Sequence, residues 1–172
     1  DYVDVNHLIN VRNEVAAQYQ GKIINLEEIR RLAFAQTLAR LGLPDEGYAD
    51  FLNRLYLKHR FEDITLYDDV LPTMNLLKQR FKIALLSNGN SYPEKCGLEN
   101  VFDVVVLAQD YGFEKPDKRL FDATFDLLDC SPEQVIYIGD SLTNDYYGAN
   151  NAGAMGVWPV SYTHLRAHET DR

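Results

Sequence analysis

The sequence predicts an α/β fold, in which a bundle of helices precedes a doubly wound parallel sheet. Two patterns predict it. After roughly the first third of the chain, short apolar runs alternate with helix-compatible segments, as parallel strands joined by crossover helices do. The first third instead places apolar residues at helical spacing without a strand-like run. The 172 residues are 46% hydrophobic, which is enough for one medium-sized domain or a domain with an insertion.

Three amphipathic helices are expected in the first third. The first covers about residues 8–19, and the third covers about residues 48–59. Between them, residues 26–41 follow Asn25, which is a good helix N-cap. Because no strand separates these helices, they predict a small bundle, and we assign its aromatic residues and His59 no chemistry.

Four strands and several helices are expected in the rest of the chain. Apolar runs predict strands at 82–86, 102–107, 135–138 and 155–158. Helices are expected at 69–81, 92–97, 118–129 and from the loop after residue 140 to about residue 153.

The composition excludes several classes of protein. The net charge is −9, with no basic run and no long apolar span, so nucleic acid and membrane are poor candidate partners. Cys96 and Cys130 lie far apart, outside any CxxC pattern, so neither a zinc site nor a disulfide framework is indicated. A reducing cytoplasm is the expected compartment.

Both ends of the sequence have unusual features. The chain opens at Asp1 without an initiator methionine or a signal peptide, so we expect an upstream segment to be missing. Residues 160–172 include VSYTHLRAHET, which resembles translated sequencing-adapter DNA, and we exclude them from the fold. This exclusion removes His164 and His168, which argues against a histidine-rich metal site.

Polar residues follow three of the predicted strands. Asp140 comes directly after the strand at 135–138, and Asp145 lies five residues later. Two carboxylates at the carboxyl end of a strand suit a hard cation such as Mg²⁺. The alternative is that Asp140 merely caps the following helix.

Ser87 and Lys115 follow the other two strands, at 82–86 and 102–107. A hydroxyl, an ammonium group and a carboxylate pair are the parts that a phosphoryl-transfer site requires, and parallel strands would bring them to one edge of the sheet. Taken singly, Ser87 could belong to an ordinary turn and Lys115 to a solvated loop.

Three motifs in this order resemble the haloacid dehalogenase-like hydrolases. LLSNGN is similar to the family's second motif, EKPDKRLF to its third, and IGDSLTND, followed by GANNAGAMGVW, to its fourth. The resemblance implies a Rossmann-like core at residues 68–159 and a helical cap domain at residues 1–67. It also implies roles for individual residues: Ser87 binds the phosphoryl group with Asn88 and Gly89, Lys115 steadies the transferring group, and Asp140 and Asp145 hold Mg²⁺.

One part of the family pattern is absent from the sequence. Members open with a strand carrying DxDxT, whose first aspartate is the nucleophile, and the 172 residues contain no such motif. Asp1 and Asp4 are poor substitutes for it. We therefore expect the core to lack its first strand and this chain to be inactive by itself.

For the whole protein, the resemblance implies a magnesium-dependent phosphatase that cleaves a small phosphate monoester through an aspartyl-phosphate. The substrate class is left open among nucleotides, flavin mononucleotide and sugar phosphates; SNGN followed by Tyr92 and Pro93 favours the first two. Two alternatives remain: a 2-haloacid dehalogenase-type hydrolase, which needs no cation, and a non-catalytic phosphate-binding domain.

Overall fold

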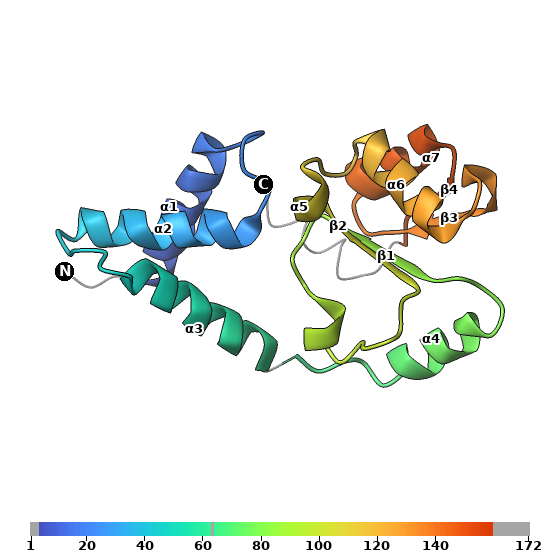
Figure 1. Ribbon diagram of the computed structural model, residues 1–172, viewed down its shortest axis with the longest axis horizontal. Helices are drawn as coiled ribbons and strands as arrows, with labels where there is room; N and C mark the ends of the chain where they lie inside the picture. Colours follow the sequence, from blue (N-terminus) through green and yellow to red (C-terminus); the bar gives the residue numbers. More distant parts are fainter. Residues whose placement is uncertain (1–3, 63, 160–172) are drawn as a thin grey trace.

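The computed structural model describes residues 4–62 and 64–159, so Asp1 and the segment 160–172 lie outside the described residues. Helices α1, α2 and α3 lie together at one end of the molecule, and the strands lie at the other with α5, α6 and α7 (Figure 1). The helices span α1 Val5–Gln18, α2 Leu26–Arg40, α3 Tyr48–Glu62, α4 Val70–Lys78, α5 Ala108–Tyr111, α6 Lys118–Leu128 and α7 Gly148–Ala152. The strands span β1 Ala84–Ser87, β2 Val104–Leu107, β3 Ile136–Ile138 and β4 Met155–Val157. The prediction of an α/β fold with parallel strands is confirmed.

Side chains cap the first two helices where the sequence places capping residues. The Asp4 carboxylate accepts a hydrogen bond from the His7 backbone N–H at 2.7 Å, so it begins α1. The Asn25 side chain accepts from the backbone N–H groups of Glu27 and Glu28 and begins α2. Each cap satisfies backbone donors that the first turn of a helix leaves without partners.

The helices of the first third share an apolar cluster of their own. Val11 and Val15 of α1 pack against Ile29 and Ala33 of α2, and all four are buried. The face of α3 that the sequence marks as apolar, which includes Phe51, is mostly exposed instead. Helical spacing identifies an apolar face, but only neighbouring elements bury it.

The four strands form two parallel pairs rather than one continuous hydrogen-bonded sheet. β1 pairs with β2 in the register Ala84 to Val104, and β3 pairs with β4 in the register Ile136 to Met155. No described strand is hydrogen-bonded between β1 and β3. The second pair exposes Ile136 by 63% and Ile138 by 67%.

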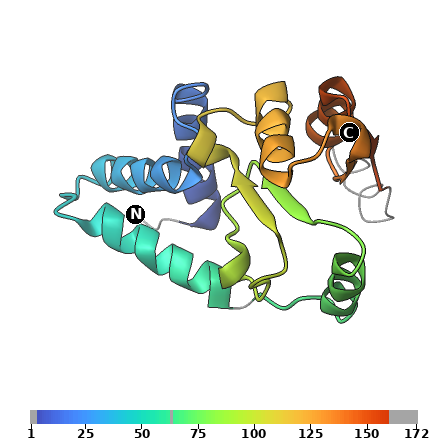
Figure 2. The same ribbon diagram turned by 45° about the vertical axis from the view of Figure 1, so that its right-hand side comes forward.

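Helix α6 holds the two strand pairs to one core. It packs on β1, β2 and α7 (Figure 2) and buries Phe121, Phe125 and Leu128, the face that its helical spacing predicts. At the start of α7, a Cβ added to Gly148 would lie 2.9 Å from the Phe121 ring, so the two helices approach closely there. This packing fixes the loops on either side of α6, which carry the candidate site.

Two 3₁₀ turns and one π-helical turn complete the described elements. The 3₁₀ turns are η1 Pro93–Lys95 and η2 Pro132–Gln134, and the π-helical turn is η3 Leu142–Tyr147. α7 continues directly from η3, where the sequence predicted one ordinary helix. None of the described helices combines the length and the apolar character that crossing a membrane requires.

Hydrogen bonds join the helical end to the strand end through the loop after β1. The Tyr92 hydroxyl donates to Glu27 of α2 at 2.8 Å and accepts from the Gln109 side chain at 3.0 Å. Arg60 of α3 donates to the Ser91 hydroxyl at 3.0 Å. The first three helices are therefore tied to the same loop that begins at Ser87.

Candidate active site at the carboxyl ends of the strands

The four residues singled out in the sequence lie at the ends of the strands or on the segments that follow them. Ser87 is the last residue of β1, and Lys115 lies in the loop between α5 and α6. Asp140 follows β3, and Asp145 lies in η3. These are the positions from which side chains reach the crevice of an open parallel sheet.

A buried ion pair joins two of these segments. Lys115 Nζ lies 2.6 Å from Asp145 Oδ1, and the two side chains are only 10% and 4% exposed. Burial opposes ionisation of Asp145, but hydrogen bonds from Lys115, the Ser141 backbone N–H and Tyr137 outweigh it and hold the pKa of Asp145 below its ordinary value. The ammonium group therefore has a fixed anionic partner.

Tyr137, at the centre of β3, completes the surroundings of that ammonium group. Its hydroxyl accepts from Lys115 Nζ at 2.7 Å and lies 3.0 Å from Asp145 Oδ1 and 3.2 Å from the Leu86 carbonyl oxygen, either of which can accept its proton. Lys115 Nζ also donates to Leu86 at 3.3 Å. Burial, and then the charge of Asp145, raise the pKa of Tyr137, so this hydroxyl stays protonated.

The Asn88 side chain holds the backbone of Lys115 in place. Its amide nitrogen donates to the Lys115 carbonyl at 3.0 Å, and its amide oxygen accepts from the Lys115 N–H at 2.8 Å. This reciprocal pair uses both ends of the amide. The structure thus gives Asn88 a positioning role in addition to the substrate-binding role that the sequence predicts.

The turn after β1 leaves the Ser87 hydroxyl able to donate. Its oxygen accepts a hydrogen bond from the Gly89 N–H at 3.0 Å, so its own proton is not used in that bond. The next residue, Asn90, is fully buried, and neither its amide nitrogen nor its amide oxygen has a hydrogen-bond partner among the described residues.

The Asp145 carboxylate packs against the backbone that follows β3. A Cβ added to Gly139 would lie 2.3 Å from the Asp145 carboxyl carbon, so that carboxylate sits directly on the backbone next to Asp140. Asp145 Oδ2 accepts from the Ser141 N–H at 2.9 Å. The backbone carbonyl of Asp140 accepts from the Trp158 indole N–H at 2.9 Å, and its side chain is exposed.

These contacts bring the three motif segments into one place. Asn88 and Lys115 join the first two, and Lys115 and Asp145 join the last two. Two cavities, of about 350 and 390 Å³, are not lined by Ser87, Lys115, Asp140 or Asp145, although the second is lined by Glu114 and Asp117 on either side of Lys115. Within the described residues, no group of three or more His, Cys, Asp or Glu side chains forms a ready metal site.

Tyr137 is the site residue that the sequence interpretation missed. It lies inside the apolar run at 135–138, which predicts a strand and gives Tyr137 no separate role. A tyrosine in such a run needs a hydrogen-bond partner for its hydroxyl, and that requirement was the available signal.

The carboxyl ends of the parallel strands thus carry a serine, a lysine and two aspartates on segments that meet around Lys115. The chain belongs to the haloacid dehalogenase-like hydrolase family, which it matches over residues 5–153. The resemblance drawn from the three motifs is thereby confirmed.

Individual relatives show how much of a whole protein the chain spans. Over 108 residues it is 32% identical to the glyceraldehyde 3-phosphate phosphatase of Methanopyrus kandleri. This match covers 59% of the present chain and 46% of that protein. Over 169 residues it is 27% identical to the pyrimidine 5'-nucleotidase YjjG of Escherichia coli, covering 94% of this chain and 70% of that protein. The chain thus spans less than half the length of the first of these relatives.

A solved structure shares the fold. The crystal structure of the 2-haloacid dehalogenase from Pseudomonas syringae pv. Tomato DC3000 superposes with a TM-score of 0.81 at 24% identity, over 91% of this chain and 69% of that one. At this identity the likeness describes the arrangement of the strands and helices.

Proposed function

We propose that the whole protein is a magnesium-dependent phosphatase that hydrolyses a small phosphate monoester through an aspartyl-phosphate. The observation that carries this proposal is the convergence on Lys115, whose backbone is held by Asn88 and whose ammonium group is held by Asp145 and Tyr137. A phosphoryl group carries its charge on its oxygens, and an immobilised cation on a segment neighbouring the Ser87 hydroxyl suits such a group.

Each residue has a distinct part in that reaction. The Ser87 hydroxyl donates to a phosphoryl oxygen, since its oxygen already accepts from Gly89 and its proton remains available. Lys115 neutralises charge on the same group as it develops in the transition state. Asp145 and Tyr137 keep the ammonium group in one position, which removes the cost of orienting it during the reaction.

Asp140 and Asp145 are the residues that would hold Mg²⁺. Carboxylate oxygens are the donors that this cation prefers, and Asp140 presents an exposed carboxylate after β3. Asp145 already binds Lys115 and Tyr137 through Oδ1 and the Ser141 N–H through Oδ2, so Oδ2 is the atom with room for a further partner. When bound, Mg²⁺ would supply charge neutralisation for the phosphate.

The nucleophile would come from a DxDxT segment of the whole protein, because the 172 residues contain no such motif. Residues 68–159 would form the catalytic core, and residues 1–67 would form a cap that excludes water and selects the leaving group. The hydrogen bond from Tyr92 to Glu27 supports a cap that contacts the core beside the site.

The substrate is a small phosphorylated metabolite. Relatives named for glyceraldehyde 3-phosphate and for pyrimidine nucleotides support this class without choosing within it. Flavin mononucleotide remains a further candidate on the basis of the SNGN segment and the residues after it.

One observation favours a second candidate, a 2-haloacid dehalogenase-type hydrolase. Asp145 is already engaged by an ammonium group, and no cluster of three acidic, histidine or cysteine side chains occurs in the part of the chain that the structure describes. Carbon-centred hydrolysis by an aspartate needs no cation. The carboxylate pair of Asp140 and Asp145 supports the phosphatase over it.

The test uses the chain with a DxDxT strand joined upstream of Asp1, screened against phosphate esters with Mg²⁺ present. Asp140→Asn should lower phosphate release at least about 100-fold, because metal binding contributes several kcal/mol to such reactions. Asp126→Asn removes an exposed carboxylate of α6 and should leave the rate unchanged. Full turnover by the Asp140 variant would refute the assignment of the metal site.

A further inference from the structure

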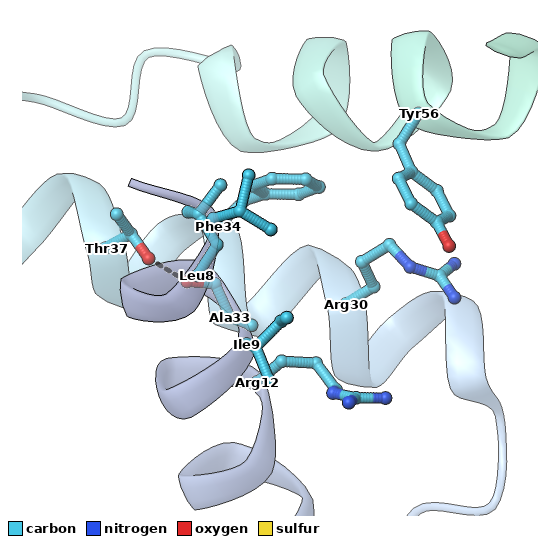
Figure 3. A pocket seen from close by; sticks show the side chains of 9 residues that line it. Leu8, Ile9, Arg12, Arg30, Ala33, Phe34, Thr37 and Tyr56 are labelled. Atoms are coloured by element: carbon cyan, nitrogen blue, oxygen red, sulfur yellow. Dashed lines mark hydrogen bonds between the residues drawn. The ribbon is translucent and has the colours of Figure 1, made fainter. Parts of the chain in front are cut away.

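The helical end of the molecule contains a cavity remote from the strand ends. It has a volume of about 350 Å³ and lies among α1, α2 and α3 (Figure 3). This volume is at the lower end of the roughly 300–1,000 Å³ of small-molecule sites. One part of its wall is apolar, formed by Leu8, Ile9 and Phe34 among others.

The polar part of the wall contains two arginines together with Thr37 and Tyr56, and no acidic residue among the described residues lines the cavity. The side chains of Arg12 and Arg30 come from α1 and α2, and the Arg30 guanidinium points toward Tyr56 of α3 (Figure 3). In a chain with a net charge of −9, a cavity lined by two cations and no anion is selective for a negatively charged occupant.

Arg30 is held in place but not neutralised. Its guanidinium carbon lies 4.1 Å from the centre of the Tyr56 ring, which fixes its plane. Its Nη1 is buried and has no hydrogen-bond partner among the described residues. A buried donor of this kind costs free energy until an acceptor reaches it.

The nearby acids are already engaged elsewhere. Glu14 forms an ion pair with Arg40, and Glu28 forms one with Arg31. Glu27 accepts a hydrogen bond from the Tyr92 hydroxyl. Across residues 4–62 and 64–159, neither Arg12 nor Arg30 has a carboxylate within ion-pair distance. The described residues thus supply no ion-pair partner to either arginine of this cavity.

We propose that this cavity binds a small organic carboxylate with an apolar body, such as a medium-chain alkanoate. The carboxylate would accept hydrogen bonds from the guanidinium groups of Arg30 and Arg12, since a guanidinium matches the two oxygens of a carboxylate. The alkyl chain would lie against Leu8, Ile9 and Phe34 and remove apolar surface from water. This site goes beyond the proposed reaction and shares no lining residue with the strand ends.

The test is an NMR titration of the full chain with octanoate, with acetate and 1-octanol as the two half-ligands. Octanoate should give saturable chemical-shift changes confined to α1, α2 and α3. Its affinity should be at least about tenfold above that of either half-ligand. 1-Octanol lacks the charge-assisted hydrogen bond, which contributes about 1.5–3 kcal/mol, and acetate lacks the apolar contact. Equal affinity for octanol, or shifts outside these helices, would overturn the proposal.

Two arginine variants and one matched control complete the test. Arg30→Gln and Arg12→Gln should each weaken octanoate binding about tenfold, since each removes one charged donor. Arg80→Gln also removes an arginine stacked on an aromatic ring, Phe81, but outside the cavity, and should bind octanoate normally. Arg12 is exposed, so its variant remains decisive even if the Arg30 variant fails to fold. Unchanged binding by the Arg12 variant would refute the site.

Discussion

Replacing Lys115 by methionine removes the ammonium group and leaves the Asp145 carboxylate buried. The two charges lie 2.6 Å apart on side chains that are 10% and 4% exposed. At an effective dielectric constant of about 20, their attraction is about 6 kcal/mol, which offsets the cost of burying them. Removing one partner of such a pair typically costs about 3–5 kcal/mol, so Lys115→Met should lower the free energy of unfolding by about that amount.

Urea denaturation measures this change, and Lys118→Met provides the control. Lys118 also pairs with an aspartate, Asp122, but both side chains are about half exposed. An exposed pair four residues apart on a helix contributes only about 0.3–0.5 kcal/mol. With a slope of about 2 kcal/mol per molar urea, Lys115→Met should move the midpoint down by about 2 M and the control by less than about 0.5 M.

The pH dependence separates lost charge pairing from lost packing. In the parent chain the pKa of Asp145 is lowered, so its stabilising contribution is present above the ordinary carboxyl pKa and is lost as the pH falls through the folded-state value. In Lys115→Met, burial remains while the Lys115 hydrogen bond is gone, so the pKa of Asp145 should rise. The difference in stability between the two proteins should therefore be largest near pH 7 and shrink toward pH 3.

Removing the second charge should restore much of the loss. Lys115→Met combined with Asp145→Asn leaves no buried charge, so it should be more stable than Lys115→Met alone. The reasoning is refuted if Lys115→Met costs no more than Lys118→Met, or if its cost does not change between pH 7 and pH 3.

Three further substitutions have defined outcomes. Tyr137→Phe removes a buried hydroxyl that bonds Asp145 and should cost about 1–3 kcal/mol in urea denaturation; a loss below about 0.5 kcal/mol would contradict its role. Gly148→Ala puts a methyl group 2.9 Å from the Phe121 ring and should cost about 1–3 kcal/mol; an unchanged thermal midpoint would contradict this packing. Gly139→Ala places a methyl group 2.3 Å from the Asp145 carboxyl carbon, so it should displace that carboxylate and, in the chain carrying an upstream DxDxT strand, lower metal-dependent turnover; normal turnover would contradict the placement.

Much of the fold was predictable because local signals and burial agree. The apolar face of α6, with Phe121 and Phe125, faces the strands as its helical spacing predicts. Asn25, the predicted N-cap, stands at the start of α2, and its side chain accepts hydrogen bonds from backbone N–H groups. Ser87 and Asp140 lie at strand ends because an abrupt change from apolar to polar residues marks where a strand stops.

Other features depend on contacts between distant residues and were not predictable. The sequence predicted a core that lacks its first strand, and β1 and β3 belong to separate pairs within the described residues; the order of the pairing was not predictable, since it depends on which strands meet. The apolar face of α3, including Phe51, is mostly exposed because no described element covers it fully. The hydrogen bonds of Tyr137 join residues up to 51 positions apart, which no local pattern encodes.

The central claim is that the strand-end site transfers a phosphoryl group with the help of a cation. The most direct test uses the chain carrying an upstream DxDxT strand and two substrate classes, phosphate esters and 2-haloacids. Each substrate class is assayed once with Mg²⁺ and once with EDTA. The account predicts phosphate release from phosphate esters that EDTA abolishes, and no halide release from 2-haloacids. Halide release that is indifferent to EDTA, without phosphate release, would contradict it.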